Sequence, residues 1–296
     1  MGGALSKTLL CPLQRVVVLK QLGDKGSTVE IAQKIMREGD GAKAFWRGNL
    51  TSILIRFPYS GIQLIAYDQI KHVFQNSAGL SDNDKVQSAS SFWGKFLSKG
   101  AAGAAAATIS GTIVFPGEVI RTRLMSGNAE FRTITGTASA IWKETNGPRN
   151  FYRGLGASLT QRVPDILLNY AVYESVFFEM KNRGFDKSAC IMSGSAAAAL
   201  AAIAITFPLD VVKRRMQMAG KGYDGIAYRS MLHCITDTYS RNGLRAFYAG
   251  ASLEAVRCVP QVGLMWFTIE FFRDLLTTVD DRYVAAAAAR AMPATA

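Results

Sequence analysis

An acid and a base follow a proline at the end of a long uncharged stretch near residue 210. Asp210 and Lys213 stand three positions apart, just after Pro208. In a helix this spacing places both side chains on one face, where they can form ion pairs. Pro208 removes one backbone hydrogen bond and is expected to kink the helix beside them. These residues therefore offer electrostatic pairing at the end of a kinked helix.

The same pattern occurs three times in the chain. The two further copies are Pro116 with Glu118 and Arg121, and Pro12 with Gln14 and Val17. Pro116 ends the uncharged stretch 100–117, as Pro208 ends the stretch 188–209. Both stretches are long enough to cross a bilayer as helices. Three copies at nearly even spacing indicate an internally repeated membrane protein.

A second set of markers keeps the same period. In each third of the chain an aromatic residue and a glycine precede a proline, and an acid follows it. The three sets are Trp46, Gly48, Pro58 and Asp68; Tyr152, Gly154, Pro164 and Glu174; Tyr248, Gly250, Pro260 and Glu270. The expected domains are repeat 1 (residues 1–85), repeat 2 (86–185) and repeat 3 (186–279), followed by a disordered Ala-rich tail (280–296).

Repeat 1 is expected to be short at its N-terminal end. Eleven residues precede Pro12, whereas the expected helices around the other two motif prolines begin more than twenty residues before them, so either this helix is short or the sequence starts late.

These motifs resemble those of the mitochondrial carrier family over about residues 2–278. In that family a Pro-x-acid-x-x-base motif closes each odd helix, and an aromatic-acid-x-x-base motif closes each even helix. The resemblance implies an all-α membrane protein with six transmembrane helices in three pseudo-threefold repeats and short interfacial helices. The expected transmembrane helices are 2–21, 49–74, 92–125, 156–181, 187–218 and 252–277. The expected interfacial helices are 28–38, 133–144 and 228–240.

The resemblance also implies a gate on the matrix side, where each acid pairs with the base of the next repeat. The pairs are Glu118 with Lys213, Gln14 with Arg121, and Asp210 with Val17. Only the first is an ion pair, and the second is possible as a hydrogen bond. Gln21 and Gln217 stand where the family places bracing glutamines.

A second gate is implied on the cytoplasmic side, because alternating access needs two barriers. The same rule pairs Glu174 with Arg273, Glu270 with Lys71, and Asp68 with Phe177. The alternative is that these are ordinary helix-end charges at the lipid headgroups. The threefold register of the motifs favours the gate.

Several charges fall in the middle of the other expected membrane helices: Arg56, Arg162 with Asp165, and Glu254 with Arg257. A charge at bilayer depth costs at least ~2.5 kcal/mol, so these side chains should face a wet interior. Three arginines meeting in one cavity would suit a phosphate or carboxylate group, since the guanidinium fork binds both. An alternative is that Arg162 and Asp165 pair with each other and contact no substrate.

The resemblance assigns substrate contacts to positions seven and eight after each repeat glycine. These include Arg56, Gln161, Arg162 and Arg257. Lys7 and Glu254 resemble residues of the adenine nucleotide, ATP-Mg/phosphate and coenzyme A carriers, where the lysine binds phosphate. Two positions depart from that subgroup: Ile55 replaces a base, and Gln161–Arg162 fills the space expected for adenine. An amino acid or a carboxylate is therefore an alternative substrate.

Composition narrows the remaining function classes. The net charge is +12. The basic residues are spread along the chain and no nucleic-acid-binding fold signature appears, so nucleic acid is not expected as a partner. The expected partners are anionic lipids, cardiolipin among them, and an anionic solute. Four cysteines without pairing logic are expected to be reduced, and two histidines are too few for a histidine metal site. No nucleophile–base pair or phosphate loop predicts an enzyme, and no cofactor is expected.

The sequence therefore predicts a monomeric multi-pass carrier that exchanges an anionic, phosphate-bearing metabolite by alternating access. The expected location is the mitochondrial inner membrane, with another organelle membrane as the alternative. A non-transporting interaction protein derived from a carrier is the remaining alternative.

Overall fold

The computed structural model describes residues 2–78, 89–145, 147–218, 220–221, 225–268 and 271, with the side chains of 2–4 and 71–102 left out. Long helices make up most of this part of the chain. Those with defined ends are α1 (Gly2–Gln21), α3 (Asn49–Ala78), α4 (Ala89–Met125), α6 (Leu155–Asn182) and α7 (Lys187–Met218). A further helix covers 251–268. The all-α prediction is confirmed, and the starts and ends of α1 and α7 match the expected ones. The last expected helix, to 277, and the tail 280–296 run beyond the described residues.

Three short helices occupy the expected interfacial positions: α2 (Thr28–Met36), α5 (Ile134–Lys143) and α8 (Met231–Asn242). Each begins after a hydroxyl residue that caps it. Ser27, Thr133 and Ser230 each accept a hydrogen bond from the backbone nitrogen three residues later, at 3.1–3.2 Å. Such caps satisfy amide groups that the first helical turn leaves open. Short 3-10 helices lead from these interfacial helices to α3, α6 and helix 251–268, respectively. They are η1 (Gly41–Trp46), η2 (Gly147–Tyr152) and η3 (Leu244–Tyr248).

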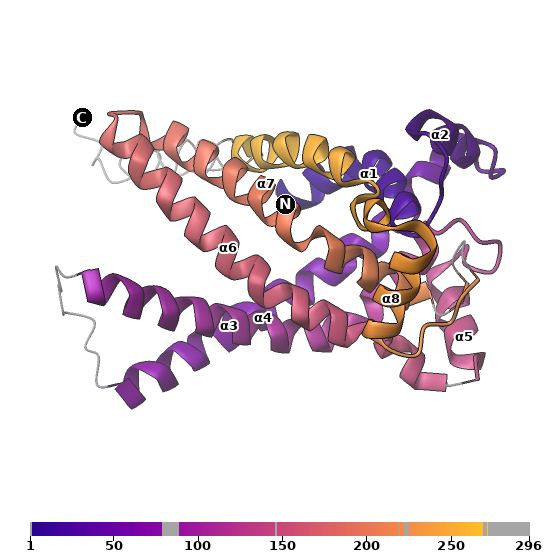
Figure 1. The fold of residues 1–296 in the computed structure, drawn as a ribbon, viewed down its shortest axis with the longest axis horizontal. Coiled ribbons are helices and arrows are strands. Elements are labelled where there is room, and N and C mark those ends of the chain that lie inside the picture. The colour runs from indigo at the N-terminus through magenta and orange to yellow at the C-terminus, as the bar shows by residue number, and fades with distance from the viewer. Residues whose placement is uncertain are drawn as a thin grey trace, which may run out of the picture.

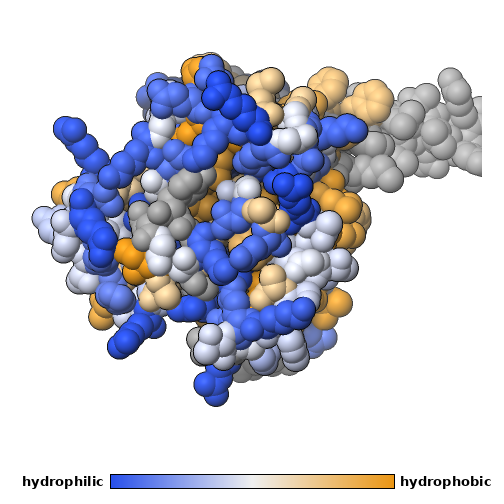
Figure 2. All heavy atoms as spheres, turned by 90° about the vertical axis from the view of Figure 1, so that its right-hand side faces the viewer, coloured by the Kyte–Doolittle hydropathy of each residue, from blue (hydrophilic) through white to orange (hydrophobic). Residues whose placement is uncertain are grey.

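The bundle narrows at one end. Figure 1 shows the long helices meeting near α5 and α8 and diverging at their opposite ends. We call the end beside α2, α5 and α8 the narrow end. Figure 2 shows it from outside as largely hydrophilic, with apolar side chains mostly around its margin. Within the described residues, Gly103–Met125 and Lys187–Met218 are long and apolar enough to cross a membrane by length and composition, as the sequence predicts.

The proline motif and the aromatic–glycine motif contact each other. A proline inside a helix leaves the carbonyl four residues earlier without its amide donor. Trp46 donates from Nε1 to the carbonyl of Thr8, four residues before Pro12, at 2.9 Å. Tyr248 donates from its hydroxyl to the carbonyl of Ala204, which Pro208 leaves open, at 3.2 Å. The aromatic residues therefore satisfy the backbone groups that two of the motif prolines free.

We expect Tyr248→Phe to lower the unfolding free energy by about 1 kcal/mol, because it leaves the Ala204 carbonyl without a donor. The matched control is Tyr152→Phe, since the Tyr152 ring stacks on Phe115 and its hydroxyl makes no hydrogen bond to a described residue. Thermal unfolding of the purified protein in detergent measures both. Equal losses in the two variants would show that the hydroxyl of Tyr248 contributes nothing.

The glycine of each aromatic–glycine motif allows two repeats to approach closely. Gly48, Gly154 and Gly250 have φ angles of 80°, 85° and 93°, a backbone region that residues with a side chain rarely adopt. A Cβ on Gly154 would lie 3.2 Å from the carbonyl oxygen of Lys213 on α7. The glycines therefore allow α3, α6 and helix 251–268 each to begin in close contact with the proline motif of another repeat.

Three buried arginines join α1, α4 and α7 at the narrow end. Each donates from Nε, at 3.2 Å, to the backbone carbonyl nine residues after another repeat's motif proline: Arg15 to Met125, Arg123 to Gln217, and Arg215 to Gln21. Arg15 also pairs with Glu38 at 2.6 Å, and Arg123 pairs with Glu144. A buried cluster that includes Cys11, Met125 and Met218 packs beside them. This ring holds α1, α4 and α7 together.

Candidate functional site

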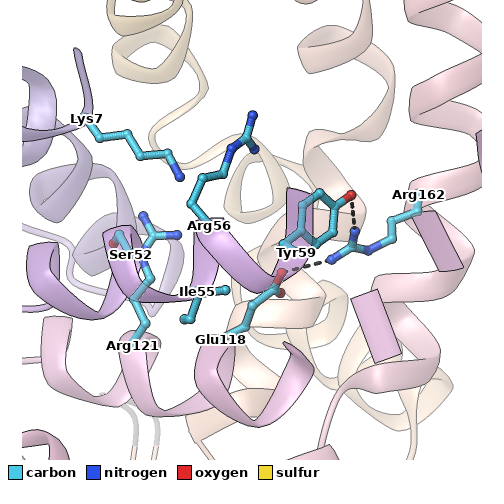
Figure 3. Close-up of a pocket in the computed structure, with 8 residues that line it drawn as sticks. All are labelled: Lys7, Ser52, Ile55, Arg56, Tyr59, Glu118, Arg121 and Arg162. Carbon is cyan, nitrogen blue, oxygen red and sulfur yellow. Dashed lines mark hydrogen bonds and ion pairs between the residues drawn. The ribbon is translucent and has the colours of Figure 1, made fainter. Parts of the chain in front are cut away.

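A cavity of about 210 Å³ opens between α1, α3, α4 and α6. Its lining consists of Lys7, Ser52, Ile55, Arg56, Tyr59, Glu118, Arg121 and Arg162. Figure 3 shows these side chains directed from the four helices toward one space. Four of the eight residues are basic and one is acidic. The structure therefore brings together three predicted substrate residues, Lys7, Arg56 and Arg162, in a positively charged cavity.

Glu118 is the shared acid of this cavity. It pairs with Lys213 of α7 at 2.9 Å, as the repeat rule predicts, and with Arg162 of α6, also at 2.9 Å. Arg162 donates further to the hydroxyl of Tyr59 at 3.1 Å. Gly111 makes room for it, since a Cβ there would lie 2.7 Å from the guanidinium carbon. Arg162 thus connects the cavity to the predicted matrix gate.

The alternative in which Arg162 pairs with Asp165 is wrong for this structure. Asp165 instead accepts a hydrogen bond from Thr206 of α7 at 3.5 Å. The spacing of three residues allows the pair, but Glu118 on α4 offers the guanidinium a carboxylate across the helix interface. Asp210, expected opposite Val17, lies close enough to Gln161 to interact with it electrostatically. Gln161 therefore lies against the predicted gate.

Arg257 is not among the residues that line the cavity, but its charge is close enough to repel those of Lys7 and Arg121. It pairs with Glu254 one turn earlier on helix 251–268 and donates to Gln261. Arg56 and Arg162 thus line the cavity, and Arg257 lies nearby, paired with Glu254 on its own helix. Ile55, which stands where the subgroup has a base, fills the space above Gly117 of α4.

The remaining residues of the predicted matrix gate lie at the narrow end. No hydrogen bond joins Gln14 to Arg121 among the described residues. Gln217 accepts a hydrogen bond on its side-chain oxygen from Thr122 at 2.6 Å. Gln21 contributes its backbone carbonyl to the arginine ring. Pro12, Pro116 and Pro208 lie inside α1, α4 and α7, and each helix continues past its proline.

The predicted cytoplasmic gate falls largely outside the described residues. The side chain of Lys71 and both Glu270 and Arg273 lie there, so the two predicted ion pairs stay predictions. Asp68 is exposed, and Phe177 stacks on Tyr173 at 5.8 Å. The described helices diverge toward this end of the bundle (Figure 1).

Sequence reasoning missed the cavity roles of three lining residues. Arg121 was assigned to the gate, and Ser52 and Tyr59 were not assigned at all. Tyr59 stands one turn from Arg56, and its ring lies 5.5 Å from the guanidinium carbon of Arg162. The sequence feature that could have identified Tyr59 is an aromatic residue one helical turn from an arginine in the middle of an expected membrane helix. The four cysteines form no disulfide, and the described residues contain no cluster of three metal-binding side chains.

Comparison with known proteins gives consistent matches. The sequence profile of the family described as mitochondrial carrier protein matches residues 1–78, 92–182 and 186–280. The "Probable envelope ADP,ATP carrier protein, chloroplastic" of Arabidopsis thaliana is 28% identical over 287 residues, covering 94% of this chain and 70% of the relative. The "Mitochondrial carrier protein CoAc1" of Zea mays is 28% identical over 299 residues, covering 93% and 84%. The "Mitochondrial adenine nucleotide transporter ADNT1" of Arabidopsis thaliana is 26% identical over 309 residues, also covering 93% and 84%.

The profile matches coincide with the three repeats that the motifs mark, and they cover most of the chain. Within each matched segment a proline motif, an interfacial helix and an aromatic–glycine motif follow in the same order. This chain therefore belongs to the mitochondrial carrier family, whose members are transporters rather than enzymes.

Proposed function

We propose that this protein exchanges an adenine nucleotide, or a metabolite with a similar phosphate group, across an organelle membrane. The observation that carries the proposal is the charge of the cavity. Lys7, Arg56 and Arg121 line it without a carboxylate partner among the described residues, while the one acid, Glu118, is held by Arg162 and Lys213. A cavity with three uncompensated cations favours a ligand with several negative charges.

The relatives support the same substrate class. Two of the three named above are adenine nucleotide or ADP,ATP carriers by name. Their locations differ, one in the chloroplast and one in the mitochondrion. We propose the mitochondrial inner membrane for this chain, as the family resemblance implies, with another organelle membrane as the alternative. We also propose that the protein acts as a monomer in contact with anionic lipids.

Binding tests the substrate class before transport is measured. We expect ADP or coenzyme A to raise the thermal unfolding midpoint of the purified protein in detergent, whereas malate and aspartate do not. A ligand at a hundred times its dissociation constant stabilises the folded state by about 2.7 kcal/mol. Lys7→Ala should remove this stabilisation, and Asp165→Ala should retain it.

The opposite pattern selects the alternative substrates. Stabilisation by aspartate or malate that is lost in Asp165→Ala and retained in Lys7→Ala would replace the phosphate proposal with an amino acid or carboxylate.

A further inference from the structure

Arg121 lies where a gate residue is expected, but its surroundings are those of a ligand-binding group. It projects from α4 into the cavity described above. Two of its guanidinium nitrogens, Nε and Nη2, are buried and have no hydrogen-bond partner among the described residues. A buried guanidinium without a partner is costly, because the lost hydration is not replaced. The position therefore needs an acceptor that the described protein does not supply.

The missing acceptor has a simple cause in the sequence. The repeat rule gives Arg121 the residue at position 14 of α1 as its partner, and position 14 is glutamine rather than an acid. The acid nearest in the cavity, Glu118, already pairs with Arg162 and Lys213. No carboxylate of a described residue lies within ion-pair distance of Arg121. The charge of Arg121 is therefore available to a ligand that enters the cavity.

Lys7 completes the arrangement from the opposite helix. It projects from α1 toward the guanidinium of Arg121, as Figure 3 shows, and the two charges are close enough to repel each other. Glu118 attracts both charges from the same cavity, but it already pairs with Arg162 and Lys213, so the two cations still favour an anion between them. An ammonium and a guanidinium that face one space are the donors that proteins use for phosphate oxygens.

We propose that Arg121 is a substrate ligand in this protein and that, with Lys7, it forms a subsite for one phosphate group of a di- or triphosphate. The inference rests on the proposed function and deepens it, because it places the phosphate end of the substrate, which carries the most charge, between Arg121 and Lys7. Gln14 is then the residue that frees Arg121 for this role. A carboxylate at position 14 would occupy Arg121 and exclude the phosphate.

The test introduces that carboxylate. Gln14→Glu is expected to pair with Arg121, which raises the unfolding midpoint of the ligand-free protein and weakens pyrophosphate binding at least about tenfold. Arg121→Gln should weaken pyrophosphate binding by a similar factor. Lys20→Gln is the matched control, since it lies on the same helix, changes the net charge by the same amount and does not line the cavity. Titration calorimetry in detergent with pyrophosphate and with ADP gives the affinities.

Greater stability together with weaker binding in Gln14→Glu is a result that simple damage to the fold does not produce. Pyrophosphate binding by Gln14→Glu as tight as that of the unmodified protein would overturn the subsite, and so would an unmodified protein that does not bind pyrophosphate. Binding of pyrophosphate but not ADP, with weakening in Gln14→Glu, would support the subsite and reject the nucleotide. ADP binding that Gln14→Glu leaves intact would support the nucleotide and reject the subsite.

Discussion

Replacing Arg123 by methionine is expected to lower the unfolding free energy by about 3–5 kcal/mol. The side chain of Arg123 is fully buried on α4. Its loss leaves the carboxylate of Glu144 and the carbonyl of Gln217 without their donor, the latter at 3.2 Å in the intact protein. Methionine fills much of the volume, so the loss reports the unpaired polar groups rather than a cavity.

A surface pair provides the matched control. Arg183 pairs with Glu179 at 2.7 Å, and both side chains are more than half exposed. Such a pair contributes at most about 1 kcal/mol, so Arg183→Met should leave the midpoint of thermal unfolding almost unchanged. Equal losses in the two variants would show that the arginine ring does not stabilise the narrow end.

The helices could be predicted from sequence because the repeat markers constrain them three times over. The bounds of α1 and α7 follow from the distance between each proline motif and the next turn signal. The pair between Glu118 and Lys213 could be predicted for the same reason, since the repeat fixes which positions face each other.

The partner of Arg162 could not be predicted in this way. Asp165 stands three residues away and is the nearest acid in the sequence. Glu118 lies 44 residues away and becomes the partner only because Gly111 lets the guanidinium approach α4 closely. That choice depends on how α6 lies against α4, which the residue pattern of either helix does not record.

The arginine ring escaped prediction because its acceptors are backbone carbonyls. Every residue has a carbonyl, so the acceptor leaves no mark on the sequence. Met125 stands nine residues after Pro116, as Gln21 and Gln217 do after their prolines, and its carbonyl accepts from Arg15 at 3.2 Å. The backbone therefore provides this contact, whatever side chain stands at the position.

Lys7→Ala is expected to have the largest effect on transport. Lys7 lines the cavity from α1 and has no acid partner among the described residues. Loss of one charged contact to a phosphate costs about 1.5–3 kcal/mol, which corresponds to at least about a tenfold fall in exchange rate below saturation. Lys20→Ala is the control, since Lys20 lies on the same helix and is not among the residues that line the cavity.

The most direct test of the central claim is ADP counter-exchange by the purified protein in liposomes. Liposomes that contain unlabelled ADP should take up labelled ADP far faster than liposomes without internal nucleotide. Lys20→Ala should retain this exchange, and Lys7→Ala should lose at least about nine-tenths of it. Folded protein that exchanges neither ADP, ATP nor coenzyme A above the level of protein-free liposomes would contradict the account.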